Sequence, residues 1–137
     1  MEVTTENVLE KYGITDVNKK GHVVQKIAEN LNSLYLSTPE KSKPITNIDT
    51  GMDIEIWKGG INETFGKDEY FSNISYQDKL NKIAVMPHLA KLIKYGEVRA
   101  NEAANKHNPN SKVRYAYLVA SITVDGKDYN MNMDIRK

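Results

Sequence analysis

The clearest pattern in the chain is the alternation of apolar and polar residues over positions 112–136, which predicts two paired β-strands. Asp125-Gly126 supplies the two positive-φ positions of a type I′ turn, so Val124 should face Lys127. Counting outward assigns one face to the core, namely Ala116, Leu118, Ala120, Ile122, Tyr129, Met131, Met133 and Ile135. The other face is polar and carries Tyr115, Tyr117, Val119, Ser121, Thr123, Asp128, Asn130, Asn132, Asp134 and Arg136. A shift of one residue would mix the two sets, so the pattern supports this register.

Apolar residues at helical spacing predict helices on both sides of the middle of the chain. Val24, Ile27 and Leu31 share one side of a helix from about His22 to Leu36. A shorter helix is expected at 8–12, capped by Thr4 or Thr5 and ended by Gly13.

A second helical stretch begins at Ser75, which with Asp78 resembles a capping box. Its apolar side is formed by Leu80, Ile83 and Ala84, and Pro87 interrupts it. Because proline is favoured in the first turn of a helix, another helix is expected from Pro87 to Tyr95, ended by Gly96.

The remaining segments predict a second hairpin and several connections. Residues 43–47 and 52–58 form its strands, with Met52, Ile54 and Ile56 on a buried face. A helical turn at 61–65 and a short strand at 97–100 are also expected, with a linker at 37–43 and loops at 66–73 and 101–111. The prediction is one α+β domain over 1–137: N-terminal helices (1–42), then an antiparallel sheet of two hairpins with inserted helices (43–137).

Composition narrows the functional classes. The 137 residues carry a formal net charge of +1, which argues against a dedicated basic nucleic-acid binder. There is no cysteine, so disulfides, thiolate catalysis and cysteine metal sites are excluded. No apolar run is long enough to cross a bilayer, and the first residues are acidic where a signal peptide would be basic. We expect a cytoplasmic protein that needs no cofactor and no membrane.

One group of residues could carry catalysis. His107 precedes Arg114 and Tyr115, and together with Lys58 these residues could cleave RNA without a metal. The imidazole would move a proton and the cations would stabilise the phosphorane charge. The alternative is a loop histidine beside a tyrosine pair that packs against Arg136. His22 and His88 are expected to be surface or packing residues, and Asp53 with Glu55 are expected to be solvated charges, so no metal site is predicted.

Other residues could bind a partner protein. Glu63, Asp68 and Glu69 form an acidic cluster that could mimic nucleic-acid phosphates, and the alternative is an ordinary solvated loop. Trp57, on the polar side of its strand, could anchor a partner or be buried under a helix. The candidate partner-binding residues are Trp57, Lys58, Glu63, Asp68, Glu69, Tyr70, Tyr115, Tyr117 and Arg136.

Several short segments between Pro44 and Arg136 occur in the order of a known family. They are Ile45-Thr46-Asn47, Asp49-Thr50-Gly51, Ile54 to Trp57, Gly60-Ile61, Glu63-Thr64-Phe65, Lys82-Ile83-Ala84, Leu89 to Gly96 and Val124-Asp125-Gly126-Lys127. This order resembles the third type of large polyvalent protein-associated domain, found in phage and mobile-element proteins. The resemblance implies an α+β fold similar to that of barnase, EndoU, nuclease colicins and RelE.

The resemblance has two departures that bear on activity. Such domains continue past the matching Arg-Lys into a strand with aromatic and histidine residues, whereas this sequence ends at Lys137. The near-neutral charge also differs from the basic groove that an RNA-cleaving toxin needs. Both weigh against a nuclease, and the N-terminal helices favour a complete small protein.

Two functional hypotheses follow from these observations. The first is an accessory protein of a phage or mobile element that binds and inhibits a host nucleic-acid-directed defence enzyme, as anti-CRISPR proteins do. Its partner would be a defence protein or ribonucleoprotein. The alternative is a metal-independent ribonuclease toxin domain that uses His107, Arg114, Tyr115 and Lys58, with RNA as its partner.

Overall fold

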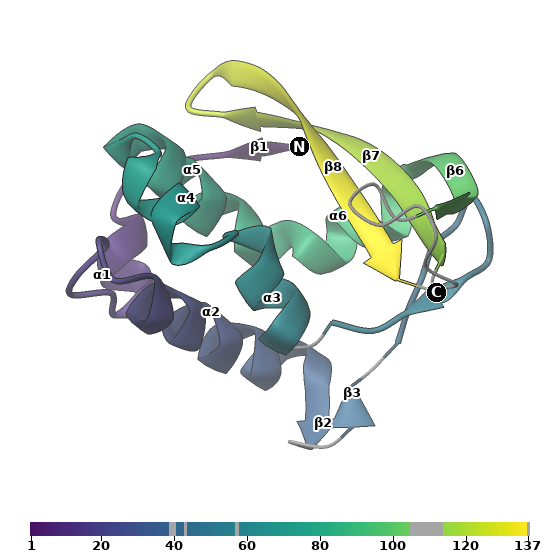
Figure 1. Ribbon diagram of the computed structural model, residues 1–137, viewed down its shortest axis with the longest axis horizontal. Helices are drawn as coiled ribbons and strands as arrows, with labels where there is room; N and C mark the ends of the chain where they lie inside the picture. The colour runs from purple at the N-terminus through teal and green to yellow at the C-terminus, as the bar shows by residue number, and fades with distance from the viewer. Residues whose placement is uncertain (39–40, 43, 57, 105–113, 137) are drawn as a thin grey trace.

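The computed structural model describes residues 1–38, 41–42, 44–56, 58–104 and 114–136, which fold into an α+β domain as predicted (Figure 1). The helices are α1 (Val8–Tyr12), α2 (Lys20–Tyr35), α3 (Lys58–Thr64), α4 (Asp68–Asn73), α5 (Tyr76–Val85), the 3-10 turn η1 (Met86–His88) and α6 (Leu89–Tyr95). The strands are β1 (Glu2–Val3), β2 (Leu36–Thr38), β3 (Lys41–Ser42), β4 (Ile45–Thr46), β5 (Asp53–Ile54), β6 (Glu97–Ala104), β7 (Arg114–Val124) and β8 (Lys127–Arg136).

The C-terminal hairpin has the predicted register along its whole length. Val124 pairs with Lys127, Leu118 with Met133 and Tyr115 with Arg136. Asp125 and Gly126 have φ values of 51° and 79°, as a type I′ turn requires. The predicted core face is buried at Ala116, Leu118, Ile122 and Met133, whereas Tyr129 near the turn remains 36% exposed.

Strand β7 organises the main sheet. Strand β8 lies along one side of it, and the other side is shared by β6 and β1. Strand β1 is parallel to β7 and was not predicted, because two residues have no readable periodicity. Strand β6 also continues to Ala104, so residues 101–104, which were expected in a loop, belong to the strand.

The second predicted hairpin forms, but it does not join the main sheet. Strands β4 and β5 pair only with each other within the described part of the chain, through Ile45 with Ile54 and Thr46 with Asp53. The predicted alternation holds, since Ile54 is buried and Asp53 is exposed. The predicted linker at 37–43 contains another short pair, β2 with β3.

The helices follow the apolar pattern with three corrections. The helical turn expected at 61–65 is α3, which begins at Lys58, a residue predicted to end the strand 52–58. Ser75 caps α5 by accepting a hydrogen bond from the Asp78 N–H, as predicted. The expected loop at 66–73 instead contains α4, which was missed because Phe71 is its only buried residue. The threonine cap of α1 is also wrong: α1 begins after Asn7 without a side-chain cap, and Thr5 binds Asp125 of the hairpin.

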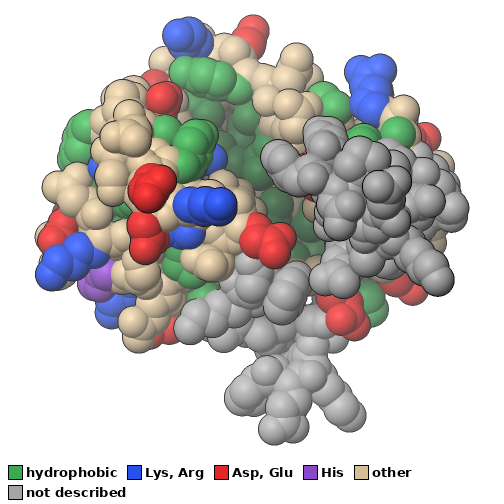
Figure 2. Space-filling view, viewed as in Figure 1, with side chains coloured by type: hydrophobic (Ala, Val, Ile, Leu, Met, Phe, Trp, Pro, Cys, Tyr) green, Lys and Arg blue, Asp and Glu red, His purple; other side chains and the backbone are tan. Residues whose placement is uncertain are grey.

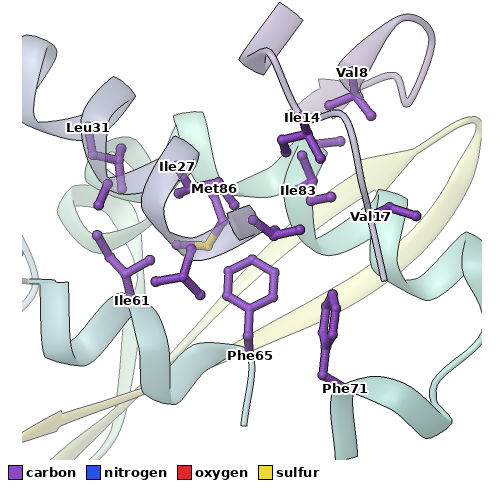
Figure 3. Close-up of a cluster of buried hydrophobic side chains, with 14 residues drawn as sticks. Val8, Ile14, Val17, Ile27, Leu31, Ile61, Phe65, Phe71, Ile83 and Met86 are labelled. Carbon is purple, nitrogen blue, oxygen red and sulfur yellow. The ribbon is translucent and has the colours of Figure 1, made fainter. Parts of the chain in front are cut away.

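Two apolar clusters hold the layers together. The helical cluster includes Ile27, Phe65, Phe71, Ile83 and Met86, with the two phenylalanine rings 6.0 Å apart and edge to face (Figure 3). The sheet cluster is formed by Ile54, Val85, Leu92, Ile93, Ala116, Leu118, Ile122, Val124 and Met133. The run from α5 to α6 contributes to both clusters and lies between the sheet and the pair α1–α2 (Figure 1).

Candidate protein-binding surface

Helices α3 and α4 meet at a tight corner that brings four of the predicted binding residues together. The Gly66 N–H donates to the Glu63 carbonyl (2.9 Å), and Gly66 has a φ of +73° that reverses the chain. A Cβ at this position would lie 2.7 Å from Cδ1 of Tyr70, so the tyrosine ring packs directly over the glycine. The corner therefore requires glycine for both its backbone conformation and its packing.

Two lysines of α5, Lys79 and Lys82, contact the α3–α4 corner. The Lys82 ammonium donates to the Thr64 carbonyl (3.0 Å) and lies 5.5 Å from the Tyr70 ring centroid and 6.0 Å from that of Phe65. Burial lowers the pKa of Lys82, and the nearby Asp78 carboxylate partly opposes this shift. The buried Lys79 donates to Asn18 Oδ1 and lies 5.0 Å from the Phe71 ring centroid. These contacts fix the aromatic side of the corner.

The outer side of the corner is acidic. Glu63, Asp68 and Glu69 are exposed, and Tyr70 is 51% exposed beside them. The Asp68 carboxylate lies 4.0 Å from the Lys20 ammonium, but Asp68 keeps 90% of its side-chain surface open. Acidic side chains, with a basic side chain between them, lie over this part of the molecule in Figure 2. The four residues thus form one surface, which we call the acidic corner.

The other predicted binding residues lie elsewhere or outside the described side chains. Tyr117 is half-buried on the outer face of the hairpin, opposite Asp134. Tyr115 and Arg136 face each other at the open end of this hairpin, and Lys58 begins α3, but only their backbone is described. Trp57 lies outside the described residues.

The predicted catalytic group stays a prediction. His107 lies outside the described residues, while Arg114 and Tyr115 pair with Ala104 and Ala103 at the start of β7. Their side chains and that of Lys58 are not described, so the structure does not test whether the four side chains meet.

The other two histidines have local environments that explain them. His22 Nε2 accepts a hydrogen bond from the Thr15 N–H (3.0 Å), a structural role in the loop before α2. Burial lowers the pKa of His88, and the nearby Lys91 and Lys11 lower it further. Among the described residues, no group of three or more histidine, aspartate or glutamate side chains is placed to hold a metal ion.

Asn47 is a buried polar residue whose role the sequence did not reveal. Its Nδ2 donates to the carbonyls of Ile93 (2.7 Å) and Gly96 (3.0 Å), and its Oδ1 accepts from the N–H and the hydroxyl of Thr50. Two further bonds hold the same turn: the Ile48 N–H donates to the Lys94 carbonyl at the end of α6, and the Val98 N–H at the start of β6 donates to Asp49 Oδ2. The turn therefore satisfies carbonyls left open where α6 ends. The Asn-x-Asp-Thr-Gly sequence at 47–51 is the pattern from which the role of this turn could have been predicted.

Comparison with known proteins gives one match. Residues 22–137 match the model of the family described as large polyvalent protein-associated domain 3. This match confirms the resemblance noted for Pro44 to Arg136 and extends it toward the N-terminus to His22, near the start of α2. No curated protein and no solved structure matches the chain. Within the described residues, no helix has the length and apolar character needed to cross a membrane.

Proposed function

The chain belongs to the large polyvalent protein-associated domain 3 family, and from this premise we propose that it binds and inhibits a host nucleic-acid-directed defence enzyme. Family membership associates the chain with phages and mobile elements. The observation that carries the proposal is the acidic corner, where α3 and α4 present three exposed carboxylates and an exposed tyrosine.

The chemistry of the corner suits a basic partner. Enzymes that act on nucleic acid bind phosphates through Lys and Arg side chains, and clustered carboxylates can occupy the same cationic groove. Tyr70 adds a large apolar surface, because aromatic anchors contribute much of the binding energy at protein interfaces. Since Gly66 and Lys82 already hold this ring in place, little conformational entropy would be lost on binding. The protein would then act by competing with DNA or RNA.

The test is competition for a purified defence enzyme, with CRISPR effectors as the first panel. We expect the wild-type protein to displace labelled target nucleic acid. Reversal of the corner charges in Glu63→Lys/Asp68→Lys/Glu69→Lys should weaken displacement at least about tenfold, or about 1.4 kcal/mol. The matched control Glu2→Lys/Glu10→Lys/Glu29→Lys reverses three exposed acids elsewhere and should stay close to wild type. Equal loss in both variants would refute a specific role of the corner.

The ribonuclease alternative is separated by a direct assay. Under the inhibitor hypothesis, labelled RNA incubated with the pure protein and a chelator stays intact. Cleavage that is lost in His107→Ala, with the far-ultraviolet circular dichroism spectrum unchanged, would replace the inhibitor hypothesis with a metal-independent ribonuclease.

A further inference from the structure

Strand β8 forms a long edge of the main sheet. It pairs with β7 from Lys127 to Arg136, and among the described residues no strand pairs with its other side. A sheet edge presents unpaired N–H and C=O groups that can hydrogen-bond to another extended chain. The edge of β8 is therefore a candidate for recognition by strand addition.

The directions of the backbone groups on β8 follow from those on β7. The N–H groups of Thr123 and Asp125 donate to the carbonyls of Met1 and Val3, so they point away from β8. In an antiparallel pair, two facing residues point their backbone groups either both toward each other or both away. Thr123 therefore belongs to a pair whose backbone groups point away from each other, and so does every second pair along the hairpin. In β8, the backbone groups that point away from β7 are those of Asp128, Asn130, Asn132 and Asp134, which face Thr123, Ser121, Val119 and Tyr117. Their N–H and C=O groups line the free edge.

This edge lacks three of the usual features that prevent pairing. Natural edge strands are commonly blocked by proline, by a bulge or by an inward-pointing charge. Residues 128–135 contain no proline, and their register with β7 is continuous, whereas the register between β6 and β7 is interrupted. Their inward positions are Tyr129, Met131, Met133 and Ile135, all without charge.

The apolar face of β8 is also incompletely covered. Met131 and Ile135 are only partly buried, and Tyr129 is 36% exposed. In Figure 1, β7 lies along one side of β8 and helix α3 lies beyond the other side. Figure 2 shows hydrophobic side chains at the floor of the hollow in this region. An added strand could therefore bury apolar side chains as well as form hydrogen bonds.

We propose that the free edge of β8 binds an extended segment of a partner protein that alternates apolar and basic residues. Its apolar side chains would continue the face formed by Met131 and Met133. Its basic side chains would lie beside Asp128 and Asp134, which are exposed on the opposite face. This site is separate from the acidic corner, and its use does not depend on the partner being a defence enzyme.

A second copy of the chain fits this edge less well. In the antiparallel register centred on Met131, Asp128 of one copy would lie beside Asp134 of the other. Like charges at facing positions are unfavourable. Charge complementarity to Asp128 and Asp134 therefore favours a basic strand from another protein over this self-pairing.

The first experiment measures amide hydrogen exchange by NMR on the free protein. The amides of Met131 and Met133 should be protected, because they face β7, while those of Asn130 and Asn132 should exchange at least about a hundredfold faster. Uniform protection at high dilution would show that the edge is already covered, and protection that disappears on dilution would indicate a second copy. Either result would overturn the proposal.

The second experiment adds a short synthetic peptide that alternates lysine with valine. Saturable binding should slow exchange at Asn130, Asn132 and Asp134, and a matched peptide that alternates glutamate with valine should bind at least about tenfold more weakly. Asn132→Pro removes an edge N–H without removing a bond to β7 and should abolish the protection. Asn132→Ala keeps that N–H and should retain it. Equal binding of both peptides, or of both variants, would contradict the proposal, as would failure of the lysine peptide to protect these amides at millimolar concentration.

Discussion

The two predicted hairpins, β7–β8 and β4–β5, differ in what holds them together. The first pairs continuously from Tyr115 with Arg136 to Val124 with Lys127, around a turn whose two residues have the required positive φ values. The second has only two residue pairs and pairs with no other strand in the described part of the chain. Its turn is instead fixed by hydrogen bonds to the end of α6, centred on Asn47.

The two hairpins are therefore stabilised in different ways. In β7–β8, alternation and turn chemistry act over neighbouring residues and specify the same register. In β4–β5, the strands are too short to be stable alone, so the turn depends on partners 46 and 49 residues away. Changes at the two turns should consequently affect different elements: those at β4–β5 should loosen α6 and β6, and those at β7–β8 should loosen only the hairpin tip and the N-terminal segment bound to it.

The largest effect is expected for Asn47→Ala. It leaves the carbonyls of Ile93 and Gly96 without their donor in a fully buried site, and it removes the acceptor for Thr50. Urea unfolding should show a loss of about 3 kcal/mol in the free energy of unfolding. Asn47→Asp keeps the size and the acceptor but replaces the donor with a charge, so it should be at least as destabilised at neutral pH. A loss in Asn47→Ala below about 1 kcal/mol would contradict the anchoring role of this side chain.

Gly126 in the β7–β8 turn and Gly51 in the β4–β5 turn form a matched pair that tests which parts of the fold depend on each turn. Gly126 and Gly51 have φ values of 79° and 73°, and an added Cβ at either position would meet no atom within 4 Å. Gly126→Ala and Gly51→Ala should therefore cost a similar amount, about 1–2 kcal/mol, from backbone strain alone. Hydrogen exchange should then differ between the two variants. Gly51→Ala should speed exchange at the end of α6, and Gly126→Ala should speed it only at the β7–β8 turn and in the N-terminal segment bound to it.

A smaller effect is expected for Thr50→Val. This change removes the hydroxyl that donates to Asn47 Oδ1 and accepts from the Met52 N–H, while the Thr50 N–H bond remains. The expected loss is about 1 kcal/mol, measured by urea unfolding. In the double variant with Asn47→Ala, the Thr50 change should cost less than it does alone, because the two residues share one network. Strict additivity would indicate that the two residues act independently.

The smallest effect tests the contact between the hairpin tip and the N-terminal segment. Asp125 Oδ2 accepts a hydrogen bond from the Thr5 hydroxyl (2.5 Å), and this bond, followed by that from the Thr5 N–H, lowers the pKa of Asp125. The folded-state pKa of Asp125 lies below the unfolded value of 3.8, so the ionised carboxylate stabilises the fold above pH 3.8. This stabilisation is lost as the pH falls through the folded-state pKa. Thr5→Val should therefore have a lower Tm than wild type at pH 7.

The difference in Tm between Thr5→Val and wild type should shrink when the pH falls below about 4. Asp125→Asn is the control, since asparagine tolerates the positive φ and does not titrate. A difference between Thr5→Val and wild type that is constant from neutral to acidic pH would show that Asp125 ionisation is not involved.

The acidic corner could be predicted only in part. Its exposed residues were named from their charges, because acidic side chains in a polar segment are expected at the surface. Its shape was not predicted, since α4 has one buried residue and the support comes from Lys79 and Lys82 on another helix. A helix with so little apolar periodicity is recognised only once its neighbours are in place.

The sequence by itself determined the parts of this protein whose signals are local: the register of β7–β8, the apolar side of α2, the Ser75 cap of α5 and the α+β class. Tertiary structure alone decided the parallel addition of β1, the separation of β4–β5 from the main sheet, the buried amide of Asn47 and the open edge of β8. The physical reason is the separation along the chain over which each interaction acts. Turn chemistry and periodicity act between residues a few positions apart, whereas these four features depend on hydrogen bonds, or on their absence, between segments that only the folded chain brings near each other.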